Sequence, residues 1–189
     1  MATYIVGITG ASGTIYGVRT LEALRKLPGV SVHLVMSEQA KRTLALETQW
    51  TPAKVEKLAD FVHDPADVAA PISSGSFKTD GMVVSPCSIK TTSAIAYSYN
   101  DNLLVRAADV CLKERRRLVL VVRESPLHLG HLRTLALLAE IGALIVPPIP
   151  AFYTRPKTID DIVNHTVGKT LDALGVEHDL FPRWRGPAA

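Results

Sequence analysis

The chain has 189 residues, 47% of them hydrophobic, and a formal net charge of +3 at pH 7. This is enough for one domain with a sizeable core, and the mild, scattered charge excludes an obvious nucleic-acid surface. Cys87 and Cys111 lack CxxC spacing, which argues against a disulfide framework or structural zinc. No apolar run approaches ~20 residues and the N-terminus does not look like a signal peptide, so we expect a cytoplasmic protein without a membrane span.

Strands and helices are expected to alternate along the chain. Short apolar runs predict strands at 4–8, 30–36, 81–84, 118–122 and 143–146. Apolar spacing and capping residues predict helices at 17–27, 37–47, 53–61, 88–97, 102–114, 129–141 and 158–174, with loops at 63–65 and 73–76. This alternation predicts one α/β domain over residues 1–176, with a parallel sheet and helices on both faces, followed by a tail at 177–189.

The run at 118–122 reads as a strand buried on both faces, and it ends on Arg123 and Glu124. Ligands of open parallel sheets bind just past the carboxyl ends of the strands. A surface ion pair is the alternative interpretation of these two residues. We prefer a functional role because the pair directly follows a buried run and precedes Pro126.

The first strand ends in a turn of small residues at 10–13, followed by a helix. Such a turn lets a ligand approach the backbone, and the helix start favours an anion, although many glycine turns serve packing only. The spacing Gly7, Gly10, Gly13 does not fit GxGxxG. Ser37 stands where a nicotinamide site would carry an acidic residue, so a phosphate or flavin ring suits this edge better.

The third strand ends in the hydroxyl-rich segment 85–92, a second possible anion cradle at a helix start. Ordinary capping by Ser88 is the alternative, but several such turns on one edge favour a ligand. Cys87 could be a nucleophile, yet no histidine is near it in sequence, so a buried thiol is the preferred interpretation.

Arg106 and Lys113 are seven residues apart on one predicted helix face, next to Asp109. They are either charged side chains on a solvent-exposed helix face or a pair of cations that binds a phosphate. Tyr153 follows the last predicted strand and is placed to reach a ligand. The sequence lacks clustered metal-ligand spacing, and Ser12 lacks the context of a hydrolase nucleophile. The residues therefore predict a flavin-binding α/β protein without fixing its reaction.

Taken together, the motifs resemble those of the UbiX-type flavin prenyltransferases, a group with a flavodoxin-like fold. The matching stretches, in the expected order, are 7–13, 85–88 with Thr91, 106–110, 112–116, 118–124, 147–148, 152–153 and 182–184. Residues 60–81 most resemble the subgroup that accompanies phenolic-acid and hydroxybenzoate decarboxylases as their B subunit.

The resemblance implies an enzyme that joins dimethylallyl phosphate to reduced FMN at flavin N5 and C6, without a metal. The product, prenylated FMN, would serve a separate UbiD-type decarboxylase. The resemblance also implies a homo-oligomer, because family members are dodecamers with the flavin site at subunit contacts.

The resemblance also assigns the site residues. FMN would be held by Gly10, Ala11, Ser12, Ser37, Ser88, Ile89, Lys90, Thr91 and Arg123. The prenyl phosphate would be surrounded by Arg106, Lys113, Arg123, Glu124, Tyr153, Lys169 and Trp184. The catalytic residues would be Glu124, which gives the departing phosphate a proton, and Ser12 with Glu47, which assist proton transfer during ring closure.

Two other functions stay open. The chain could be an FMN-binding accessory subunit of a decarboxylase, or an oxidative decarboxylase of peptidyl cysteine, although residues 17–27 lack the histidine that the latter usually needs. Departures from the family pattern are Lys169 in place of arginine, Arg133-Thr134 in place of Glu-Asn, and Tyr97-Ser98-Tyr99 in place of smaller residues. These differences would alter the affinity for phosphate and the packing between subunits.

Overall fold

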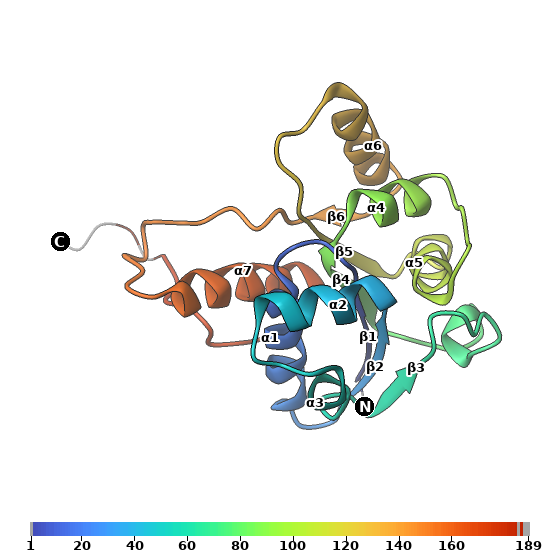
Figure 1. The fold of residues 1–189 in the computed structure, drawn as a ribbon, viewed down its shortest axis with the longest axis horizontal. Coiled ribbons are helices and arrows are strands. Elements are labelled where there is room, and N and C mark those ends of the chain that lie inside the picture. Colours follow the sequence, from blue (N-terminus) through green and yellow to red (C-terminus); the bar gives the residue numbers. More distant parts are fainter. Residues whose placement is uncertain (1, 185, 187–189) are drawn as a thin grey trace.

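A computed structural model describes residues 2–184 and 186 of the chain as a sheet covered by helices (Figure 1). The sheet has six strands in the order β3-β2-β1-β4-β5-β6, and every neighbouring pair is parallel. The strands are β1 (Ala2–Ile8), β2 (Val30–Met36), β3 (Phe61–His63), β4 (Gly81–Cys87), β5 (Arg117–Val122) and β6 (Leu144–Ile145). The expected parallel α/β sheet is therefore confirmed.

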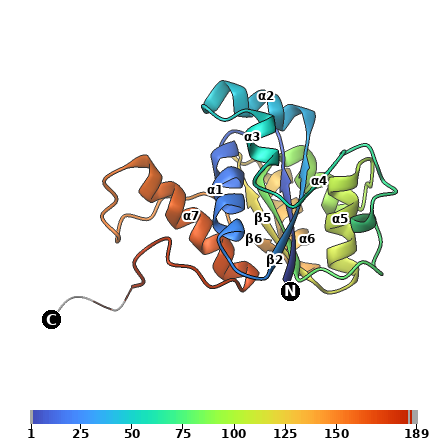
Figure 2. The ribbon, with the colours of Figure 1, turned by 90° about the horizontal axis from the view of Figure 1, so that it is seen from below.

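Helices cover both faces of this sheet. They are α1 (Thr14–Arg25), α2 (Glu38–Glu47), α3 (Pro52–Glu56), α4 (Ile89–Ala96), α5 (Leu103–Lys113), α6 (Leu129–Glu140) and α7 (Ile159–Leu174), with a 3-10 turn, η1 (Pro71–Ser73). The core on one face contains α1 and α7, and the core on the other contains α4, α5 and α6. Figure 2 shows the strands between α1 and α7 on one side and α5 on the other.

The strand β5 supplies side chains to both cores. Val119 and Val121 pack on the α1 and α7 side, whereas Leu118 and Leu120 pack on the α5 side. This alternation follows from the two-residue period of a strand. Burial on both faces confirms the prediction for residues 118–122, and pairing with β4 and β6 on either side fixes the carboxyl end of β5 at the sheet edge.

Hydroxyl side chains cap α2, α4 and α7, although α1 begins at Thr14 and not at residue 17 as expected. Ser37 caps α2 by accepting from Ala40 N, Ser88 caps α4 by accepting from Thr91 N, and Thr158 forms a capping box with Asp161. A hydroxyl in these positions satisfies a backbone N–H that has no partner inside the helix. Such caps can be recognised in a sequence because each one joins two residues that are only three positions apart.

The region between β2 and β4 was predicted wrongly in part. A helix was expected over 53–61 and a loop at 63–65, but α3 ends at Glu56 and Phe61–His63 forms the edge strand β3. The His33 ring on β2 stacks on Phe61 with centroids 4.6 Å apart, and His33 Nδ1 lies 2.9 Å from His63 Nε2. These contacts between distant residues, and not a local pattern, hold so short a strand in place.

Candidate functional site

A polar crevice lies at the carboxyl edge of the sheet, past the ends of β1, β2 and β4. It encloses about 540 Å³, a volume typical of small-molecule sites. Its lining consists of Thr9, Gly10, Ser37, Glu38, Gln39, Pro65, Ser88, Lys90, Thr91, Asp101, Asn102 and Leu104. Of the predicted flavin residues, Gly10, Ser37, Ser88, Lys90 and Thr91 therefore meet in one cavity. Ala11 and Ser12 continue the Gly10 turn, and Ile89 begins α4.

Thr9 ties two of the crevice turns together. Its hydroxyl donates to the carbonyl oxygen of Pro86 at 2.7 Å and accepts from the Ser88 N–H at 2.9 Å. The Thr9 N–H also donates to the Pro86 carbonyl oxygen at 3.2 Å. The turns after β1 and β4 are therefore fixed relative to each other, so groups on both can contact one ligand.

The glycine turn is held by side chains from α2. Thr43 Oγ1 donates to the Gly10 carbonyl oxygen at 3.1 Å, and Glu47 Oε2 accepts from the Gly13 N–H at 2.8 Å. A Cβ on Gly10 would lie 2.4 Å from the Gln39 Cβ, so this close approach of α2 requires glycine. Gly13 adopts a left-handed conformation with φ 96° and, as the N-cap residue of α1, offers no side-chain hydrogen bond.

Glu47 therefore takes the capping role that Gly13 cannot perform. Burial raises the pKa of the Glu47 carboxyl, but hydrogen bonds from the Ser12 hydroxyl and the Gly13 N–H outweigh that effect. The net pKa lies below its ordinary value, so Glu47 is an anion at neutral pH. An anion bonded to Ser12 is suited to accept a proton and poorly suited to donate one.

The two cysteines are buried. Burial raises the pKa of the Cys87 thiol to about 12 and that of the Cys111 thiol to about 11. A thiol that stays protonated is a poor nucleophile. The prediction that Cys87 is a buried thiol is thus confirmed.

Arg123 and Glu124 emerge exposed from the end of β5, beside the β4 turn. The Arg123 N–H donates to the Cys87 carbonyl oxygen at 3.1 Å, which fixes the backbone here. Glu124 Oε1 accepts from the adjacent Ser125 N–H at 3.0 Å. Within the described residues the two side chains form no ion pair with each other, so both stay available at the sheet edge.

A second group of predicted residues gathers around α7. Tyr153 lies with its hydroxyl oxygen 3.0 Å from His165 Nε2, and its ring stands 5.8 Å from the Trp184 ring. Lys169 follows His165 by one helical turn, and both line a cavity of about 510 Å³ beside Pro147. The structure therefore brings Tyr153 and Trp184 into contact and places Lys169 one helical turn from His165, the partner of Tyr153.

The segment after α7 packs back on that helix. Asp172 accepts hydrogen bonds from Arg183 at 2.6 Å and from His178 at 3.2 Å, and lies 3.6 Å from the Lys169 ammonium. With two cations beside one carboxylate, this cluster has a surplus of positive charge. Hydrogen bonding by Arg183 is the main reason that the pKa of Asp172 is lowered, so the carboxylate stays ionised at neutral pH.

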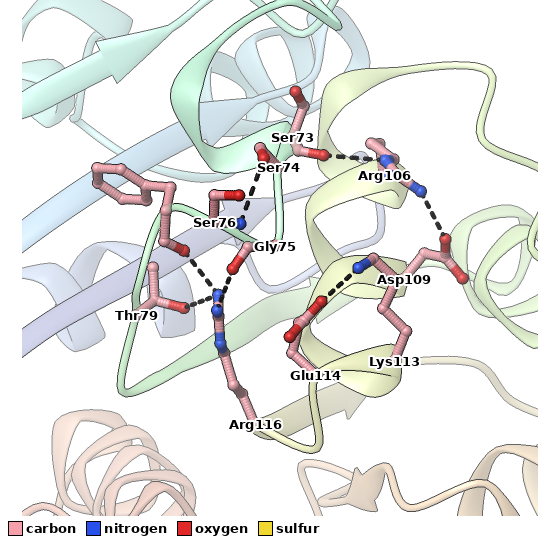
Figure 3. A network of polar contacts seen from close by, with 11 residues as sticks. Ser73, Ser74, Gly75, Ser76, Thr79, Arg106, Asp109, Lys113, Glu114 and Arg116 are labelled. Atoms are coloured by element: carbon pink, nitrogen blue, oxygen red, sulfur yellow. Dashed lines mark hydrogen bonds and ion pairs between the residues drawn. The ribbon is translucent and has the colours of Figure 1, made fainter.

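A third group lies on α5 and contacts the loop at residues 73–76 (Figure 3). Arg106 Nε donates to the Ser73 carbonyl oxygen at 3.0 Å, and its Nη1 pairs with Asp109 at 3.0 Å. Lys113 pairs with Glu114. Arg106 and Lys113 border a hollow of about 470 Å³ together with the loop at residues 73–76.

The sheet separates the cations of α5 from those of α7. α5 packs in one core and α7 in the other, on opposite faces. α5 also runs away from the crevice, since Leu104 lines it whereas Lys113 lies nine residues further, roughly 13 Å along the helix axis. Within one chain, therefore, the seven residues predicted to surround the prenyl phosphate do not converge.

Sequence reasoning did not select Thr9, Thr43 or His165. A threonine directly after a buried strand is a usable signal for Thr9. Thr43 and His165 are helix residues whose partners lie 33 and 12 residues away, so no local pattern reveals their roles.

The described part of the chain offers neither a cluster of metal ligands nor a membrane-spanning helix. Residues 2–184 and 186 contain no group of three or more His, Cys, Asp or Glu that could hold a metal ion. No helix among them is long and apolar enough to cross a membrane.

Comparison with known proteins shows to which family the chain belongs. Residues 2–171 match the family model described as Flavoprotein, so the chain is a member of the flavoprotein family. The flavin prenyltransferase UbiX of Escherichia coli K12 is 60% identical over 188 residues, covering 98% of this chain and 100% of the relative. The Thauera aromatica enzyme of the same name is 58% identical over 182 residues, covering 96% and 93%. The chain belongs to the UbiX flavin prenyltransferase family, as its motifs indicated.

Solved structures agree with this assignment. AnUbiX (PadA1) in complex with FMN and dimethylallyl pyrophosphate superimposes with a TM-score of 0.97 at 48% identity, covering 99% of each chain. A dodecameric FMN-dependent UbiX-like decarboxylase from Escherichia coli O157:H7 gives a TM-score of 0.95 at 55% identity, covering 97% of this chain and 100% of the other.

Replacing Glu47 by glutamine should weaken the start of α1. The loss of a charged cap is expected to cost about 1 kcal/mol of unfolding free energy at pH 7. Because the folded pKa of Glu47 lies below 4.5, its stabilisation is present above that pH and is lost as pH falls through the folded pKa. Urea unfolding at pH 7 and at lower pH should therefore show that the difference in unfolding free energy between Glu47→Gln and wild type is smaller in acid.

Glu140→Gln, at the exposed end of α6, is the matched control. Equal effects of the two changes on the unfolding free energy at both pH values would refute the capping role.

Proposed function

We propose that this chain is a flavin prenyltransferase that joins the dimethylallyl group of dimethylallyl phosphate to reduced FMN at N5 and C6. The product, prenylated FMN, would then pass to a UbiD-type aromatic acid decarboxylase. The observation that carries the proposal is the 60% identity to a UbiX flavin prenyltransferase over 98% of the chain. The geometry of the crevice supplies independent support.

The chemistry of the crevice suits FMN. The hydroxyls of Ser37, Ser88 and Thr91 and the Lys90 ammonium line one cavity, and the starts of α1 and α4 face the same sheet edge. Helix starts and small turn residues are a common arrangement for binding a phosphate. FMN would be held by Gly10, Ala11, Ser12, Ser37, Ser88, Ile89, Lys90, Thr91 and Arg123. Bound reduced flavin would supply the nucleophilic ring atoms of the reaction.

The prenyl phosphate needs cations, because its phosphate carries more negative charge once the allylic bond breaks. Lys169 belongs to a cluster with surplus positive charge, and Tyr153 and Trp184 lie beside it. Cations held close to the leaving group would stabilise the negative charge that develops on it. We assign Glu124 the role of proton donor to the departing phosphate, and Ser12 with Glu47 the role of accepting and relaying a proton during ring closure.

Arg106 and Lys113 would reach the site from a neighbouring subunit. The sheet lies between them and Lys169 in one chain, whereas their hollow at residues 73–76 is open at the surface. The Escherichia coli O157:H7 relative is described as dodecameric. Assembly would also cover the exposed Arg123 and Glu124 and exclude water, which would otherwise intercept a prenyl cation.

The test of this function is the mass of the flavin. Purified protein is mixed anaerobically with reduced FMN and dimethylallyl phosphate, and the extracted flavin is analysed by mass spectrometry. A parallel sample receives dimethylallyl pyrophosphate, the compound present with AnUbiX (PadA1). The expected product is heavier by one five-carbon prenyl unit and activates an apo UbiD-type decarboxylase. Tight FMN binding with no gain in mass from either donor would refute the proposal and favour an accessory subunit.

Glu124→Gln tests the proton donor. The amide keeps the size of the side chain but cannot give up a proton, so FMN should bind normally while turnover falls on the order of 10²-fold or more. Glu140→Gln again provides the control. Steady-state rates and FMN titrations measure the two effects separately, and a fully active Glu124→Gln protein would exclude this role.

A further inference from the structure

Tyr153 is a predicted phosphate contact without a rigid support of its own. It lies on the irregular segment after β6, and 48% of the residue is exposed. Its one recorded side-chain hydrogen bond joins its hydroxyl oxygen to His165 Nε2 at 3.0 Å. The two rings meet edge to face, with centroids 5.5 Å apart and an interplanar angle of 81°. The position of the hydroxyl is therefore set by the histidine.

His165 is itself fixed. It lies inside α7, is only 8% exposed, and packs against the Phe181 ring with centroids 4.6 Å apart. Burial, together with the nearby Lys169 charge, lowers the pKa of His165, and Asp172 opposes this only in part. The imidazole is thus neutral at pH 7, with one nitrogen that donates and one that accepts.

The direction of this hydrogen bond decides what Tyr153 can do. If the tyrosine O–H donates to Nε2, the hydroxyl has no proton left to offer a ligand. If Nε2–H donates to the tyrosine oxygen, the O–H is free to donate elsewhere. Phosphate oxygens accept hydrogen bonds, so only the second arrangement lets Tyr153 bind a phosphate.

The geometry points to His165 as a positioning residue: its Nε2–H donates to Tyr153 and directs the phenol O–H toward the phosphate of the allylic substrate. Lys169 stands one turn further along the same helix, so α7 aligns an ammonium and, through His165, a hydroxyl on one phosphate. This inference rests on the proposed function and adds a residue that does not itself touch the substrate.

The test is a double-mutant cycle on full-length protein, with His165→Ala, Tyr153→Phe and the double variant. The KM for dimethylallyl phosphate should rise about ten- to a hundredfold in each single variant, with a smaller change in kcat, since one hydrogen bond to a charged group is lost. The Kd for FMN should not change. The double variant should be no worse than Tyr153→Phe, because the histidine acts only through that hydroxyl.

Conservative variants separate positioning from folding. In His165→Gln an amide N–H can take the place of Nε2–H, so most of the wild-type KM should return. In His165→Asn the side chain is too short for its amide to reach Tyr153. This variant replaces His165→Ala in the double-mutant cycle if His165→Ala does not fold. His63→Ala is the matched control: it removes a histidine hydrogen bond on β3, the strand at one edge of the sheet, and should leave KM unchanged.

The outcomes distinguish this inference from the proposed function. Wild-type protein that makes no prenylated flavin refutes the function and, with it, the role of His165. An active wild type in which the two losses add, or in which His165→Gln is as impaired as His165→Ala, refutes the positioning role alone.

Discussion

The hydrogen bond from the Gly13 N–H to the Glu47 carboxylate, 2.8 Å long, is the interaction on which the flavin crevice depends. The turn after β1 must consist of small residues if a ligand is to approach its backbone, and small residues cannot cap the helix that follows. Glu47 supplies the cap from α2, and Thr43 on the same helix holds the Gly10 carbonyl. The turn thus stays open to a ligand, while side chains of the neighbouring helix α2 hold its backbone in place. That arrangement also leaves an anion beside Ser12, where the proposed reaction needs a proton acceptor.

A second constraint is the sheet itself. It divides the cationic side chains between two faces, with Lys169 on α7 and Arg106 and Lys113 on α5. No rotation of side chains can bring such groups together through a buried sheet. If all of them bind one phosphate, the site must form between subunits, and assembly becomes a requirement for catalysis. Arg106 pairs with Asp109, and Lys113 pairs with Glu114. These ion pairs would partly neutralise and orient the two α5 cations until a partner subunit binds.

The sequence predicted features that depend on local patterns. The strand at 118–122 was recognisable because an apolar run ends sharply in charge, and Ser37 and Thr158 were recognisable as caps by their spacing. Capping by Ser88 was only the alternative interpretation, and the structure shows this cap at the crevice. The crevice residues on the ends of β1, β2 and β4 followed from one topological rule. The edge strand β3 was missed because it is held by His33 stacking and not by its own three residues. The roles of Thr9 and His165 were missed for the same reason, since each depends on a partner that only the folded chain brings near.

The separation of the cations makes one measurement decisive. Chains carrying Arg106→Ala and chains carrying Lys169→Ala are each expected to be nearly inactive when assembled alone. When the two are co-expressed, some sites combine an intact Lys169 from one chain with an intact Arg106 from its neighbour. The mixed assembly should then recover roughly a quarter of the wild-type rate of flavin prenylation, the fraction given by random assortment of two chains. A mixed assembly as inactive as its parents would show that both cations serve the same site from the same chain, and would contradict a site shared between subunits.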